Sequence, residues 1–165
     1  MSYHIYTTKG LVLAERPVRE ADRIYSILTR DLGLIHATVL GVRKEVSKLR
    51  GALEPYIFSQ VSLVRGKERW RVTSADSIKN ISASQAMARP LALIEKFIQG
   101  EVSHPELFDA VEETIFSGEP NNEMFEINFV SKILFHLGYL KETDLTLDKK
   151  GLIKAINEGI QASHL

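Results

Sequence analysis

The stretch that decides the fold lies at residues 57–74 and reads IFSQVSLVRGKERWRVTS. Its first part places Val61 and Leu63 at alternate positions, which is the period of a half-buried strand. Its last part repeats this alternation, with Trp70 and Val72 set between arginines. The RGKE sequence between the two parts combines a glycine with charged residues, which is typical of a turn. We therefore expect two strands joined in a hairpin whose tip is RGKE.

Three more strands are expected upstream of this hairpin. Residues rich in β-branched and aromatic side chains lie at 4–15, 23–29 and 34–42, and a turn signal at residues 31–33 separates the last two. One long connection, residues 43–55, then leads to the hairpin. Five short strands have little core as an open sheet, and closure also removes the exposed edges. The pattern therefore predicts a small closed barrel.

The pattern changes to helices after residue 80. Apolar side chains recur at helical spacing in four stretches, and a glycine follows each of the first three. The predicted helices lie at residues 82–100, 103–118, 122–138 and 152–160. Because Pro90 lies inside the first stretch, we expect either a helix that begins there or a kink. The expected fold class is α+β by domain, with a five-stranded barrel domain at 1–80 and an all-α helical domain at 81–165.

The charges divide between the two halves of the chain. The chain of 165 residues has a formal net charge of zero. Residues 1–80 hold 14 Lys and Arg against 8 Asp and Glu, whereas residues 81–165 hold 7 against 13. Such an asymmetry points to contact between the basic half and nucleic acid or a membrane surface. The alternative is a chance placement of solvated charges.

Other features of the sequence exclude or disfavour several classes of protein. The chain has no cysteine, which excludes disulfides, cysteine-based zinc sites and a thiol nucleophile. Its five histidines are dispersed, and HExxH, Walker-type and nucleophile-elbow sequences are absent, so neither catalysis nor a metal is expected. Residues 1–4 lack a signal-peptide start, and no apolar run approaches the ~18 residues of a membrane helix. A cytoplasmic, non-enzymatic protein without a cofactor is expected.

Three cationic segments are candidates for contact with nucleic-acid phosphates. The densest is residues 43–51, where Gly41 and Gly51 would make the positive surface mobile. Gly51 and Gly33 also suit turns that need a positive φ. Lys and Arg side chains gain affinity for nucleic acid by releasing condensed counterions. The residues predicted to contact DNA are Arg16, Arg19, Arg43, Lys44, Lys48, Arg50, Arg65, Lys67, Arg69 and Arg71.

Two sets of residues leave alternatives open. Glu20 and Asp22 flank Arg19 and Arg23 and could pair with them, which would leave less charge for DNA. Aromatic side chains of the basic half are candidate platforms for base stacking, with core packing as the alternative for each. They are Tyr3, Tyr6, Tyr25, Tyr56, Phe58 and Trp70. Exposure of some of the acidic half's phenylalanines would favour a second hypothesis, a protein-binding adaptor with little DNA annealing activity. They are Phe97, Phe108, Phe116 and Phe129.

Several motifs together point to a known family. They are GLVL at residues 10–13, RPVREADR at 16–23, LTRDLGLI at 28–35, GVRK at 41–44, KLRGALEPY at 48–56 and RWRV at 69–72. PELF at 105–108 and FHLGY at 135–139 extend the match into the helical half. This pattern closely resembles RecO, the bacterial recombination mediator.

The resemblance implies an N-terminal OB-fold domain, a C-terminal helical domain, binding of single- and double-stranded DNA, and annealing of complementary strands. It also implies partnership with RecR and with the tail of single-stranded-DNA-binding protein, which helps RecA to load. Because the helical half is acidic, we expect that acidic tail to prefer the barrel or its boundary with the helices. Many relatives carry four zinc-ligand cysteines after the LGY motif, whereas residues 140–148 here have none. The chain is also shorter than usual members, in its helical part.

Overall fold

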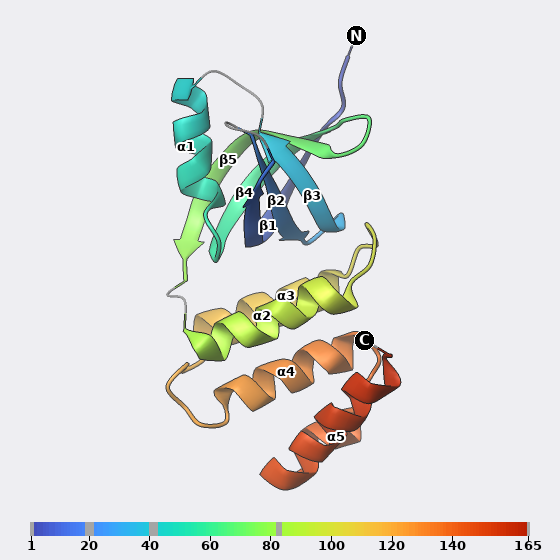
Figure 1. The fold of residues 1–165 in the computed structure, drawn as a ribbon. Coiled ribbons are helices and arrows are strands. Elements are labelled where there is room, and N and C mark those ends of the chain that lie inside the picture. The colour runs from blue at the N-terminus through green and yellow to red at the C-terminus, as the bar shows by residue number, and fades with distance from the viewer. Residues whose placement is uncertain (1, 19–21, 40–42, 82–83, 165) are drawn as a thin grey trace. The chain divides into compact units, whose positions relative to one another are not determined.

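The computed structural model describes residues 2–18, 22–39, 43–81 and 84–164, without the side chains of 43–47. Its N-terminal strands form the predicted closed barrel, with the order β1-β2-β3-β5-β4 (Figure 1). The strands are β1 (Ile5–Pro17), β2 (Arg23–Thr29), β3 (Gly33–Val39), β4 (Ile57–Arg65) and β5 (Trp70–Asn80). Strands β3 and β5 are parallel, and the other neighbours are antiparallel. This arrangement is an OB fold.

The hairpin predicted from residues 57–74 is confirmed. Arg65 at the end of β4 pairs with Trp70 at the start of β5, and the Gly66 amide donates to the Arg69 carbonyl at 3.0 Å. Because side chains alternate along a strand, Trp70 and Val72 point into the barrel core. The core residues are Val12, Tyr25, Ile27, Ile35, Ala37, Val39, Leu53, Val61, Leu63, Trp70 and Val72.

The connection between β3 and β4 differs from the prediction. It holds a helix, α1 (Arg43–Leu53), rather than a mobile positive loop. Leu49, Ala52 and Leu53 lie three and four residues apart, so they share one face of this helix and bury it. Gly51 is a helical residue here and does not have the positive φ expected for it. At Gly33 the expectation is confirmed, because φ is +76° in the turn between β2 and β3.

Helices make up the second half of the chain, as predicted. They are α2 (Gln85–Phe97), α3 (Pro105–Ser117), α4 (Phe125–His136), the 3-10 helix η1 (Glu142–Thr146) and α5 (Lys149–Ala162). Pro90 lies inside α2, so the helix does not begin at this residue. A proline inside a helix lacks one backbone hydrogen bond, and the burial of Met87, Leu91 and Ile94 offsets the free-energy cost of that loss. No helix in the described ranges is long and apolar enough to cross a bilayer.

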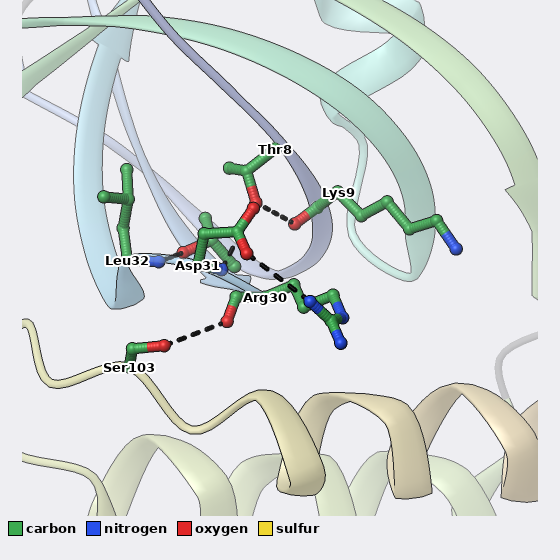
Figure 2. A network of polar contacts seen from close by, with 7 residues as sticks. Thr8, Lys9, Arg30, Asp31, Leu32 and Ser103 are labelled. Carbon is green, nitrogen blue, oxygen red and sulfur yellow. Dashed lines mark hydrogen bonds and ion pairs between the residues drawn. The ribbon is translucent and has the colours of Figure 1, made fainter.

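Two compact units divide the chain. One comprises Met1–Ser82 with Gly100–His104, and the other comprises Ala83–Gln99 with Pro105–Leu165. We call residues 100–104 the strap. Figure 2 shows the Ser103 hydroxyl donating to the Arg30 carbonyl, at 3.2 Å, in the turn between β2 and β3. The strap, which connects α2 to α3 in the sequence, thus belongs to the barrel unit.

The helical unit has its own apolar core. Phe108 and Phe129 are fully buried, so two of the four phenylalanines considered for an adaptor surface serve packing instead. Phe97 is half-buried and packs edge-on against Tyr139, with 5.1 Å between the ring centroids. Phe116 is 41% exposed on α3. Of the four phenylalanines considered for an adaptor surface, Phe116 is thus the exposed one.

Candidate nucleic-acid interface

The tip of the β4–β5 hairpin gathers four of the predicted cations around a hollow of about 640 Å³. We call Arg65, Lys67, Arg69 and Arg71 the hairpin patch. The hollow is also lined by Tyr3, Thr38, Val64, Gly66 and Glu68. Its size falls in the range of ligand pockets.

Strand register explains why Arg71 faces this hollow. Arg71 is the register partner of Thr38 on β3 and of Val64 on β4. Register partners share a face of the sheet, and the neighbouring Trp70 and Val72 point inward, so Arg71 points outward. The outer surface of three strands therefore meets the hairpin tip here.

A second predicted cation lies in the same register row on the outer face of the sheet, in which Ile24 is buried. Arg16 pairs with Ile24, Ile24 pairs with Thr38, and Thr38 pairs with Arg71. Three spacings between strands separate the two arginines, which is roughly 14 Å. The row runs across β2 and β3 from the hairpin patch to the end of β1. Arg19, in the loop that follows, lies outside the described residues.

Arg65 is the member of the hairpin patch that forms an ion pair within the protein. Its guanidinium nitrogen Nη1 contacts both carboxylate oxygens of Glu101, at 2.8 and 2.7 Å, and its Cζ lies 5.0 Å from the centroid of the Trp70 ring. Within the described ranges, Lys67, Arg69 and Arg71 form no ion pair. Three of the four patch cations are thus available to an anion.

Arg23 forms an ion pair with a carboxylate that the sequence did not suggest as its partner. This partner is Glu15 on β1, at 2.6 Å. The pair forms because the β1–β2 register brings the two strand ends together, whereas Glu20 lies outside the described residues. Arg23 therefore adds little free charge to the surface.

Of the α1 cations whose side chains the structure describes, Lys48 and Arg50, neither lines the hollow of the hairpin patch. Lys48 and Arg50 are exposed on this helix, and the side chains of Arg43 and Lys44 lie outside the described part of the chain.

Burial raises the pKa of the Tyr25 hydroxyl, and the charge of Glu15 adds to this effect. The positive charge of Arg50 lowers the pKa of this hydroxyl, so the Arg50 guanidinium interacts electrostatically with a buried tyrosine.

Known proteins resemble this chain in the same region. The sequence model described as "Recombination protein O N terminal" matches residues 1–81. A DNA repair protein RecO of Dehalococcoides mccartyi is 34% identical over 143 residues, which are 78% of this chain and 56% of the relative. A DNA repair protein RecO of Heliobacterium modesticaldum is 30% identical over 155 residues, 87% of this chain and 55% of the relative. The chain is a homologue of RecO.

The RecO relatives are longer proteins. Another DNA repair protein RecO, from Frankia casuarinae, is 38% identical over 86 residues, 52% of this chain and 35% of the relative. The chain spans about half the length of the first RecO relatives that it matches. The matched family domain ends at residue 81, close to the end of the barrel strands.

The aromatic residues of the barrel unit divide into buried and exposed ones. Tyr25, Phe58 and Trp70 are buried, so core packing holds for them. Tyr3 is 62% and Tyr6 is 38% exposed. Tyr56 is half-buried and has a φ of +68°. Tyr6 packs edge-on against the buried Trp70, and the centroids of the two rings are 5.2 Å apart.

Some site residues of the barrel unit escaped the sequence analysis. Val64 lies in the hairpin but carries no motif of its own, whereas strand register brings Thr38 to the hairpin and a tertiary contact brings Glu101 there. The described residues contain no group of three or more His, Cys, Asp or Glu side chains that could hold a metal ion. The hollow itself is lined by four cations, the carboxylate of Glu68, an exposed tyrosine and the buried Val64.

Proposed function

We propose that this protein acts in recombinational DNA repair and that its barrel unit binds the backbones of single- and double-stranded DNA. The observation that carries the proposal is the grouping of Lys67, Arg69 and Arg71 around one hollow, free of ion pairs within the described ranges. Lys and Arg side chains bind polyanions by displacing condensed counterions, without a need for a particular base sequence.

The place of the patch on the fold supports the same proposal. OB folds that bind oligonucleotides use the face of strands 2 and 3 with the loops that follow strands 1 and 4. The row from Arg71 to Arg16 crosses β2 and β3, and its two ends lie beside those two loops. A strand laid along this row would meet cations at both ends.

A salt titration tests the proposal. Binding of a fluorescent single strand, followed by anisotropy, should weaken with a log–log slope of about −0.7 per phosphate contacted. Replacing Lys67, Arg69 and Arg71 by Ala should reduce the magnitude of that slope by about two units. The matched control replaces Lys96, Lys150 and Lys154, three exposed cations of the helical unit, and should leave the slope as it is. A flat salt response of the wild-type chain would exclude phosphate-driven binding.

Strand annealing and the protein partners are further parts of the proposal. The RecO relationship supports annealing of complementary strands, contact with RecR and with the tail of single-stranded-DNA-binding protein, and through them help in loading RecA. The acidic tail suits the hairpin patch, because the helical half carries 13 acidic residues against 7 basic ones. A tail peptide should then compete with an oligonucleotide for the wild-type chain.

The alternative function is a protein-binding adaptor with little annealing activity. An annealing assay with complementary oligonucleotides, with and without single-stranded-DNA-binding protein, separates the two functions. Acceleration of duplex formation by the wild-type chain supports the mediator. DNA binding without acceleration, together with capture of RecR by the chain, would favour the adaptor.

A further inference from the structure

The hollow beside the hairpin patch has more than positive charge. Its lining includes Tyr3, which is 62% exposed, and Val64, which is 5% exposed. It also includes one carboxylate, that of Glu68. Lys67, Arg69 and Arg71 stand around these residues. A purely phosphate-binding surface needs the cations alone, so the aromatic and apolar parts call for another ligand group.

The strand register makes this apolar part continuous. Val64 on β4 is the register partner of Ile5 on β1, so both side chains lie on the outer face of the sheet. Ile5 is 59% exposed, and Tyr3 lies two residues before it in the chain. An exposed tyrosine, an exposed isoleucine and a buried valine thus meet the cations at one place. Exposed apolar groups gathered in this way mark interaction sites.

We propose that this hollow holds one unstacked base of a single strand, with the base against Tyr3 and the adjacent phosphates on Lys67, Arg69 and Arg71. The inference rests on the proposed DNA binding and specifies the class of DNA. A nucleotide joins a flat apolar ring to an anion, and the hollow joins an aromatic wall to a cationic rim. Every base has a π-face, so stacking of this kind tolerates any sequence.

The geometry gives single strands an advantage over duplexes at this site. In a duplex, the flat faces of the bases are already covered by their neighbours, so Tyr3 gains no stacking partner. The phosphates of a duplex still reach the cations. The site should therefore bind both forms of DNA through charge and should add affinity for bases only in the single strand.

The test compares a short thymidine strand with an abasic strand of the same length, which has the same phosphates and no bases. The full wild-type chain should bind the thymidine strand more tightly, by about fivefold or more for one stacked base. In Tyr3→Ala this ratio of affinities should fall towards one. Tyr3→Phe keeps the ring and should keep the ratio. Circular dichroism verifies that both variants are folded.

Two further measurements distinguish the inference from the proposed function. A strand that carries iodouracil should photo-crosslink to Tyr3 in the wild-type chain. The variant without Lys67, Arg69 and Arg71 should lose affinity for the thymidine strand, the abasic strand and the duplex together. An equal thymidine-to-abasic ratio in Tyr3→Ala and wild type would overturn the base site and leave DNA binding in place. Failure of the wild-type chain to bind any of the three probes would overturn the proposed function itself.

Discussion

Arg65 holds Glu101 across 36 positions of sequence, with Nη1 within 2.8 Å of both carboxylate oxygens. The contact ties the strap to the barrel hairpin, and it occupies one cation of a patch that is otherwise free within the described ranges. Both side chains keep 40% or more of their surface exposed. Exposed ion pairs are worth about 0–1 kcal/mol. A phosphate can therefore displace this carboxylate at small cost.

Removal of the carboxylate should strengthen DNA binding. Glu101→Gln frees the Arg65 guanidinium and removes a negative charge beside the site, so affinity for a single strand should rise by about twofold to fivefold at low salt. Fluorescence anisotropy measures the change. Glu106→Gln removes an equal charge from the exposed first turn of α3 and serves as the control. If Glu101→Gln gains no more than the control, Glu101 does not compete with DNA for Arg65.

Gly33→Ala should destabilise the barrel more than an ordinary glycine substitution. Gly33 has a φ of +76°, and a Cβ there would collide with the Val102 backbone of the strap. Gly100→Ala provides the control, since Gly100 has a φ of +82° and open space around it. The positive φ costs about 1–2 kcal/mol in each variant. Urea unfolding should show a larger loss for Gly33→Ala, and equal losses would mean that the strap moves away without cost.

Trp70 should report on binding at the hairpin. It is the single tryptophan of the chain, and the Arg65 guanidinium lies over its ring. DNA phosphates that bind the Arg65 guanidinium will change the electric field at the indole. Tryptophan emission should therefore shift when a single strand is added. The variant without Lys67, Arg69 and Arg71 should lose the shift at the same strand concentration. An unchanged emission spectrum at saturating DNA would place the binding surface elsewhere.

Tyr25 should make the folded state less stable at alkaline pH. Burial raises the pKa of its hydroxyl above the ordinary value of 10.0, so the folded protein binds the Tyr25 proton more tightly than the unfolded chain does. This contribution to stability is complete below the unfolded pKa and is lost as pH rises through the higher folded pKa. Tyr25→Phe should therefore lose less stability above about pH 10 than wild type.

Urea midpoints between neutral and alkaline pH provide the measurement for Tyr25. Tyr3→Phe is the control, because it removes one hydroxyl from an exposed tyrosine instead of from a buried one. Ultraviolet titration of the folded protein should also show a tyrosine that ionises above the ordinary pKa of 10.0. Identical alkaline slopes in wild type and Tyr25→Phe would contradict the raised pKa.

Local periodicity by itself determined most of the architecture. The alternation around Val61 and Val72 predicted the hairpin, and apolar spacing after residue 80 predicted the helices. These patterns can be read within a few residues, because strands and helices repeat every 2 and 3.6 positions. The motifs from Gly10 to Val72 also indicated the RecO relationship, which the comparisons bear out.

The tertiary structure alone decided which residues share a surface. Closure of the barrel aligned Arg16 with Arg71 in one row, and the return of the strap brought Glu101 to Arg65. It also showed that the supposed cationic loop is α1, a helix whose Leu53 is part of the barrel core. Such pairings depend on register and packing between segments far apart in the chain. The periodicity of one segment carries no information about them.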